Sequence, residues 1–183
     1  MPESVLPAAV LFDMDGTLVD TEQLWWQAAA ELAARLGESF AGKVAAETVP
    51  RPGALALLAA LREARVPTAL VSASPRQVVD LVLSSIGRDW FAVTLAAEDT
   101  ARTKPAPDPY LAAAERLGLD PAACVAVEDT PTGVASAAAA GCAVLAVPST
   151  AVPMPDGDRI TLLDSLERAD LALLGKLCAT PAV

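Results

Sequence analysis

The chain contains no histidine in its 183 residues. This absence excludes every mechanism that needs a histidine base, including Ser-His-Asp and Cys-His systems, and it removes the commonest zinc ligand. Cysteine is also scarce, because Cys124, Cys142 and Cys178 are widely spaced and form no CxxC pair. Cys124 and Cys142 fall in apolar runs, so we interpret them as small core residues. This cysteine usage predicts a protein of the reducing cytoplasm.

Basic residues are few, with 13 Lys and Arg against 23 Asp and Glu, for a net charge of -10. Such a charge repels phosphate backbones, so nucleic acid is not an expected partner. It also repels a small anionic substrate, so a site for one must carry its own cations or a metal. The N-terminal residues lack a basic region ahead of an apolar stretch, and the longest weakly polar run, residues 134–147, is shorter than a membrane span of about 20 residues. We therefore expect neither a signal peptide nor a membrane partner.

Aromatic residues make up 4% of the chain, whereas hydrophobic residues make up 54%. The length suits one domain with a small appendage. Apolar runs alternate with Ala- and Leu-rich stretches bounded by Pro and Gly, which predicts strands over 10–12, 66–71, 92–96, 124–127 and 142–147 and helices over 21–36, 40–47, 52–65, 75–87, 107–117, 131–140 and 162–174. This alternation indicates an α/β fold, a doubly wound parallel sheet of Rossmann-like type with helices on both faces. Ligands of such sheets bind beyond the carboxyl ends of the strands.

The first predicted strand ends in Asp13-Met14-Asp15-Gly16-Thr17. Taken alone, this segment is more typical of an ordinary turn, because Asp and Gly are common turn residues. A calcium-binding loop is excluded by spacing, since its required Gly and Glu positions are occupied here by Leu18 and Leu24.

Other polar side chains follow the later strands. Ser72 ends the second strand, and Ser74, ahead of Pro75, is expected to cap the next helix. Lys104 precedes a helix and Glu128-Asp129 ends the fourth strand; a lone loop lysine is usually solvated, and paired carboxylates are often plain surface charge. Strand ends of a parallel sheet converge, however, so these groups should share one pocket. Several carboxylates in one pocket need a neutralising cation, and Mg²⁺ suits carboxylates, water and a substrate phosphate.

This combination of groups predicts phosphoryl transfer through the protein. One aspartate attacks phosphorus and becomes an aspartyl-phosphate, which is then hydrolysed. Lys104 and Ser72 bind phosphate oxygens, where negative charge spreads in the transition state. The second aspartate protonates the leaving oxygen and later takes a proton from water.

The four segments together resemble the motifs of the haloacid dehalogenase superfamily of phosphatases. Residues 13–20, DMDGTLVD, are similar to its first motif, Ser72 to its second, Lys104 in TKPAPDPY to its third, and Glu128-Asp129 in VAVEDT to its fourth. The resemblance implies a nucleophilic Asp13, a general acid/base Asp15, and Mg²⁺ held by Asp13, the Asp15 carbonyl and Asp129, with Glu128 as a direct or water-mediated ligand. The phosphate is then expected at Gly16, Thr17, Ser72, Ala73 and Lys104. Within the superfamily, an aspartate at position 15 favours phosphatases over dehalogenases.

Members of the most similar branch, which includes phosphoglycolate phosphatases, sugar phosphatases and β-phosphoglucomutase-like proteins, usually carry a cap of several helices between the first two motifs. Here we expect a core of residues 1–20 and 49–183 and a reduced cap of residues 21–48, with room for two helices. Either the small cap is natural, or part of it lies outside this sequence. Apolar residues such as Trp25 and Trp26 would then be partly uncovered, which predicts a homodimer through the cap region or a water-accessible site.

The sequence therefore predicts a Mg²⁺-dependent phosphomonoester hydrolase that acts on a small phosphorylated metabolite. A β-phosphoglucomutase-like phosphosugar mutase is one alternative, although it needs a closing cap. A catalytically weak binding protein on the same fold is another. A phospho-accepting receiver domain would place its hydroxyl and lysine after the last acidic strand end, whereas Ser72 and Lys104 precede Asp129.

Overall fold

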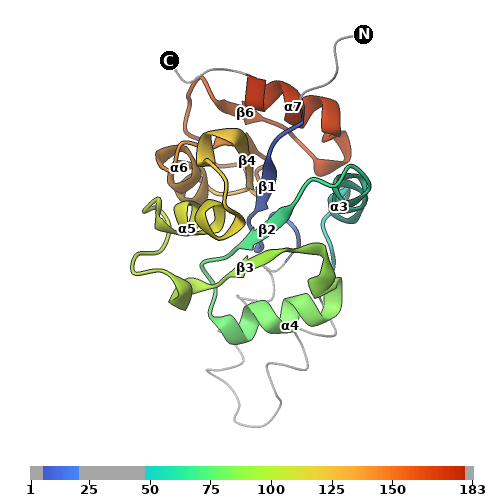
Figure 1. The fold of residues 1–183 in the computed structure, drawn as a ribbon, viewed down its shortest axis with the longest axis vertical. Coiled ribbons are helices and arrows are strands. Elements are labelled where there is room, and N and C mark those ends of the chain that lie inside the picture. Colours follow the sequence, from blue (N-terminus) through green and yellow to red (C-terminus); the bar gives the residue numbers. More distant parts are fainter. Residues whose placement is uncertain (1–5, 21–47, 180–183) are drawn as a thin grey trace.

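A computed structural model describes residues 6–20 and 48–179, and these form a six-stranded sheet in the order β3-β2-β1-β4-β5-β6 (Figure 1). Every neighbouring pair of strands is parallel. The strands are β1 (Ala9–Phe12), β2 (Thr68–Val71), β3 (Val93–Leu95), β4 (Cys124–Glu128), β5 (Ala143–Ala146) and β6 (Ile160–Leu162). The predicted α/β parallel sheet is thus confirmed, whereas the helices predicted over 21–36 and 40–47, with Trp25, Trp26 and the proposed dimer surface, lie outside the described residues.

Helices cover both faces of the sheet (Figure 1). Alternate residues of each strand point to opposite faces, so Val10 and Phe12 pack with α3 (Ala54–Glu63), α4 (Arg76–Ile86) and α7 (Leu171–Ala179). Ala9 and Leu11 pack on the other side with α5 (Asp108–Leu117) and α6 (Pro131–Ala139). Because the inner strands are buried on both faces, they appear in the sequence as continuous apolar runs.

The C-terminal part of the chain differs from the prediction. Instead of one helix over residues 162–174, it forms the edge strand β6, a short 3-10 helix at Leu166–Arg168, and then α7. The peptide N–H of Leu163 bonds to the Ala146 carbonyl at 2.8 Å, which continues the pairing with β5. An edge strand is covered only in part, so its three residues lack the long apolar run that marks the inner strands.

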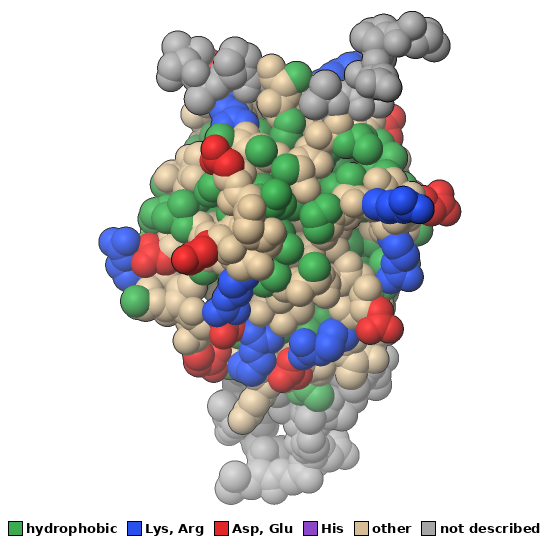
Figure 2. Space-filling model, viewed as in Figure 1, with side chains coloured by type: hydrophobic (Ala, Val, Ile, Leu, Met, Phe, Trp, Pro, Cys, Tyr) green, Lys and Arg blue, Asp and Glu red, His purple; other side chains and the backbone are tan. Residues whose placement is uncertain are grey.

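Many charged side chains lie on the surface (Figure 2), and the cysteines are buried or half-buried. On the face shown in Figure 2, acidic and basic side chains lie interspersed. Arg88 and Arg102 form ion pairs with Asp80 and Asp108. Cys124 and Cys142 are buried as expected, and Cys178 is half-buried. Among the described residues, no helix has both the length and the apolarity that a membrane crossing requires.

The sheet register sets where the functional side chains lie. Phe12 at the end of β1 is aligned with Leu70 of β2 and with Val127 of β4. The residues that follow these positions therefore leave the sheet together at one edge, which is the edge the sequence pointed to.

Candidate active site

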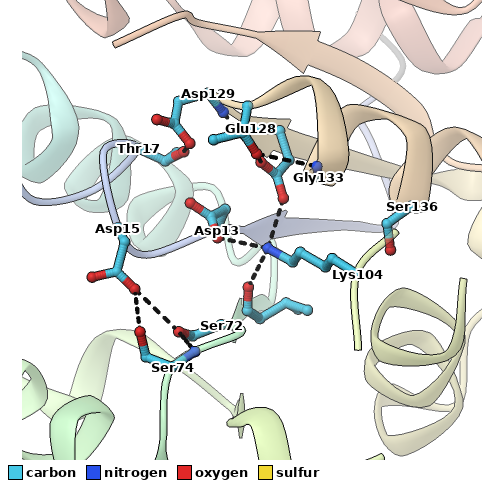
Figure 3. Close-up of polar contacts among 12 residues, drawn as sticks. Asp13, Asp15, Thr17, Ser72, Ser74, Lys104, Glu128, Asp129, Gly133 and Ser136 are labelled. Carbon is cyan, nitrogen blue, oxygen red and sulfur yellow. Dashed lines mark hydrogen bonds and ion pairs between the residues drawn. The ribbon is translucent and has the colours of Figure 1, made fainter. Parts of the chain in front are cut away.

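Asp13 and Lys104 meet at the carboxyl edge of the sheet (Figure 3). Asp13 follows β1 directly and is 6% exposed, and its peptide N–H bonds to the Val127 carbonyl at 2.9 Å. The Lys104 Nζ donates to Asp13 Oδ1 at 2.6 Å, to Glu128 Oε1 at 2.6 Å and to the Val71 carbonyl at 2.9 Å. The lysine side chain is only 5% exposed, so it is a site residue rather than a solvated loop lysine.

The neighbouring carboxylates of Asp13 and Glu128 determine the protonation state of Lys104. Burial acts to lower the pKa of Lys104, but the charges of Asp13 and Glu128 raise it above its usual value. The ammonium therefore stays protonated across the physiological range and acts as a permanent cation between the two carboxylates.

Glu128 is held from several directions. Its Oε1 also accepts a hydrogen bond from the Tyr110 hydroxyl at 2.6 Å, and its Oε2 accepts from the Asp129 N–H at 3.2 Å and the Thr130 hydroxyl at 3.4 Å. A Cβ at Gly133 would lie 1.9 Å from the Glu128 carboxylate, so only glycine permits this approach of α6. Glu128 is thus positioned as a fixed counter-charge for Lys104.

Asp129 is anchored on the opposite side of the site. Its Oδ1 accepts from the Thr17 hydroxyl at 3.3 Å, and its Oδ2 accepts from the Ser149 hydroxyl at 2.6 Å. Gly16 lies so close that a Cβ there would be 2.1 Å from Asp129 Oδ2, and its φ of 81° is also a conformation that favours glycine. Burial, as the largest cause, raises the pKa of Asp129 to about 6.

The acidic groups can hold a metal ion. Asp13, Glu128 and Asp129 each offer an oxygen, and these oxygens lie within 4.8 Å of one another. Asp13 Oδ2 is buried and has no hydrogen-bond partner among the described residues. Burial first, and then the charge of Glu128, raise the pKa of Asp13 well above its usual range. The buried Oδ2 has lone pairs available for a metal ion. The cluster also holds three carboxylates but one lysine, so a divalent cation would balance its charge.

Asp15 is held by two serines at the end of β2 (Figure 3). Its Oδ2 accepts from the Ser74 hydroxyl at 2.7 Å and, more weakly, from the Ser72 hydroxyl at 3.4 Å. The prediction that Ser74 caps α4 is wrong, because Pro75 occupies the N-cap position and the N–H of Arg76 in the first turn bonds to the Glu98 carboxylate instead. The Ser74 hydroxyl therefore does not cap the helix, and it donates its hydrogen bond to Asp15.

The structure brings most of the predicted site residues to one place. Asp13, Lys104 and Glu128 are in direct contact, and Asp129 and Thr17 form the adjoining wall with Gly16. Ser72 is buried beside Asp15, and Ala73 is exposed at the same end of β2. The contacts that were not predicted from the sequence include those of Ser74, Tyr110 and Ser149. The catalytic, phosphate-binding and metal roles of all these residues remain predictions.

Comparison with known proteins places these residues in a family context. Residues 38–141 match the family model for haloacid dehalogenase-like hydrolases. Hexitol phosphatase A of Escherichia coli K12 is 35% identical over 196 aligned residues, which cover 86% of this chain and 91% of that protein.

Solved structures show the same similarity. CbbY from Rhodobacter sphaeroides, crystallised in complex with phosphate, is 25% identical with a TM-score of 0.78, and the match covers 89% of this chain and 96% of that one. A HAD family hydrolase from Deinococcus radiodurans R1, with bound phosphate and sodium, is 28% identical with a TM-score of 0.73 over 97% and 100% of the two chains.

Proposed function

Because this chain belongs to the haloacid dehalogenase-like hydrolases and is a phosphatase, we propose that it hydrolyses a small phosphorylated metabolite through a phosphorylated Asp13, with Mg²⁺ as cofactor. The observation that supports this proposal best is the pairing of Asp13 with a buried lysine, beside a second Asp13 oxygen that has no partner in the part of the chain that the structure describes. One oxygen is thereby fixed by a cation, and the carboxylate keeps lone pairs for a metal and for attack on phosphorus.

The proposed reaction has two steps. In the first, Asp13 attacks phosphorus, the P–O bond to the leaving alcohol breaks, and Asp15 gives its proton to that alcohol. In the second, water attacks the same phosphorus, Asp15 takes a proton from it, and inorganic phosphate leaves Asp13 as a free carboxylate. Lys104 and the Ser72 hydroxyl stabilise the negative charge on the phosphoryl oxygens in both steps.

The metal would be held by Asp13, Asp129 and the backbone carbonyl of Asp15. Glu128 is a weaker candidate for direct contact, because Lys104, Tyr110, Thr130 and a peptide N–H already occupy its oxygens. When bound, Mg²⁺ would neutralise the carboxylates and the phosphate charge. Gly16 and Thr17, which lie beside Asp129, and Ala73, which follows Ser72, are proposed to contact the substrate phosphate.

The proposed substrate is the phosphate ester of a sugar or sugar alcohol. This proposal rests on the likeness to hexitol phosphatase A, a protein named for such a substrate, and to CbbY with its bound phosphate. We also propose a core of residues 1–20 and 49–183, a cap of residues 21–48 that contacts the substrate, and a cytoplasmic location. Self-association through the cap region remains a prediction.

Metal dependence is the direct test of this function. We expect the purified protein to hydrolyse p-nitrophenyl phosphate and, within a panel of sugar and sugar-alcohol phosphates, at least one ester. Excess chelator should remove this activity, and Mg²⁺ should restore it. Full activity in excess chelator would exclude the proposed mechanism. Transfer of phosphate between positions of one sugar, without release to water, would favour the mutase, and no turnover of any ester would favour the binding protein.

Metal binding should weaken in acid. The folded pKa of Asp129, about 6, lies above its ordinary value of 3.8, so protonation of Asp129 stabilises the metal-free fold. That contribution is complete below pH 3.8 and is lost as pH rises through about 6, where the carboxylate becomes available to the metal. We therefore expect Mg²⁺ to raise the melting temperature clearly at pH 7.5 and much less at pH 5.5. An equal increase at both pH values in thermal-shift measurements would contradict the role of Asp129.

Removal of the Ser149 hydroxyl should weaken the metal site without disrupting the fold. Ser149 donates to Asp129 Oδ2 and thereby orients a proposed ligand. Loss of such an outer contact typically costs about 10- to 100-fold in metal affinity. For Ser149→Ala we expect the Mg²⁺ concentration for half-maximal activity to rise by about tenfold or more, with kcat at saturating Mg²⁺ changed less. Ser84→Ala, at an exposed position of α4, is the matched control.

A further inference from the structure

The carboxylate of Asp15 contacts side chains that follow a neighbouring strand, β2. Both contacts of Asp15 Oδ2 shown in Figure 3 come from the segment after β2, at 2.7 Å from Ser74 and 3.4 Å from Ser72. The Ser72 hydroxyl also accepts a hydrogen bond from the Ser74 peptide N–H at 2.9 Å. Residues 72–74 are therefore linked to one another and to one oxygen of the Asp15 carboxylate.

The two serines differ in what else they do. Ser72 makes the longer contact with Asp15, and under the proposed function its hydroxyl turns to the substrate phosphate. Ser74 makes the shorter contact, is 7% exposed, and contributes no side-chain cap to α4. Ser74 can therefore keep its hydrogen bond to Asp15 while phosphate occupies the site.

A hydroxyl partner suits a residue that must exchange a proton. It can donate to an ionised carboxylate and, after rotation, accept from a protonated one. A lysine or arginine in the same place would favour only the ionised form, as Lys104 does for Asp13. The chemistry of Ser74 is therefore compatible with both protonation states that the two-step reaction needs.

We propose that Ser74 is a positioning residue for proton transfer, which holds the Asp15 carboxylate toward the leaving-group oxygen. This inference rests on the proposed function, in which Asp15 is the general acid. The Ser74 hydroxyl bonds to Asp15 and not to the nucleophile Asp13, whose Oδ1 accepts from Lys104, so its loss should affect mainly those reactions that need the acid. An ester with a good leaving group departs without a proton, whereas an alkyl phosphate does not.

The test compares kcat/KM of Ser74→Ala on two esters, p-nitrophenyl phosphate and glycerol phosphate. This ratio covers binding and phosphorylation of Asp13 but not the later hydrolysis. General acid catalysis is worth about 10²- to 10⁴-fold, and misplacing the acid should lose part of it. We expect kcat/KM to fall about tenfold or more for glycerol phosphate and less than about threefold for p-nitrophenyl phosphate. Ser74→Thr, which retains the hydroxyl, should recover most of the loss, and Ser84→Ala should change neither value.

The outcomes separate this inference from the proposed function. An equal fall on both esters would show that Ser74 supports the fold or the phosphate site, and no fall on glycerol phosphate would show that Asp15 needs no such partner; either result overturns the role of Ser74 alone. A wild-type protein that hydrolyses neither ester overturns the proposed function and the inference with it. If Ser74→Ala fails to fold, Ser74→Cys, which has similar size and a weak donor, should show the same split between esters or refute the role.

Discussion

Replacement of Asp13 by Asn is expected to reduce turnover by at least about 10⁴-fold, because it removes the nucleophile. An amide has nearly the same shape as the carboxylate but cannot form the acyl phosphate. The Lys104 ammonium would still be held by Glu128 and the Val71 carbonyl, so the arrangement of the site should persist. The loss should therefore appear for good and poor leaving groups alike, in contrast to the split expected for Ser74→Ala.

The same substitution should not destabilise the metal-free protein. The pKa of Asp13 is raised well above its usual range, chiefly by burial and then by Glu128, so ionising Asp13 costs more in the folded protein than in the unfolded chain. Asn carries no charge and avoids that penalty. We expect the melting temperature without metal to be equal to or higher than that of the parent protein, which is the usual relation where an active site sacrifices stability for function.

Two measurements check this result together, namely steady-state turnover with Mg²⁺ and thermal unfolding in chelator. Asp156→Asn, at an exposed loop position, makes the same chemical change far from the site and serves as the control. Retention of more than a small fraction of activity would reject Asp13 as nucleophile. A large fall in melting temperature would instead show that the Asp13 charge supports the fold through Lys104.

The fold was predictable where burial left a simple pattern. Inner strands such as β1 and β4 are buried on both faces, so they appear as short apolar runs, and Pro75 and Gly87 delimit α4 in the sequence as they do in the structure. The edge strand β6 was missed because a half-covered strand of Ile160–Leu162 has no such run, and the following leucines imitate a helical period. The pairing with β5, not local preference, decides its conformation.

The site was predictable where chain topology alone places a side chain. Asp13 and Ser72 directly follow strands, and Glu128 ends one, that a parallel sheet aligns, so their convergence follows from the fold. Tyr110 was not predicted because its hydroxyl reaches Glu128 only through the packing of α5 on the sheet. Ser74 was misassigned as a helix cap because Ser before Pro at a helix start is a frequent capping signal, and only the tertiary position of Asp15 provides the stronger partner.

Lys104 offers the second large effect, on stability as well as on turnover. It is the cation that Asp13 and Glu128 share, and the side chains of all three are nearly inaccessible to water. Removing one partner from a buried charge cluster typically costs about 3–5 kcal/mol, because the remaining charges are left without compensation. Lys104→Met keeps most of the volume and removes the charge, so it isolates the electrostatic part of the loss.

For Lys104→Met we expect turnover to fall by about 10²- to 10³-fold or more, since the phosphoryl oxygens also lose a fixed donor. The melting temperature in chelator should fall at pH 7.5. It should recover partly as pH is lowered toward 5, because protonation of the cluster then replaces the missing cation. Arg168→Met, which removes a cation from an exposed ion pair with Asp164, is the matched control and should change stability little.

Mg²⁺ should stabilise Lys104→Met more than it stabilises the parent protein. In the variant the proposed metal becomes the main positive charge beside Asp13, Glu128 and Asp129, whose oxygens lie within 4.8 Å of one another. The divalent ion therefore relieves a greater repulsion in the variant than in the parent, and binding to the folded form alone raises the melting temperature. A larger Mg²⁺-dependent increase in melting temperature for the variant is the expected result of a thermal-shift titration. A smaller increase than in the parent protein would mean that the metal site needs Lys104 in order to form. It would contradict the view that Lys104 and the metal each neutralise the same carboxylates.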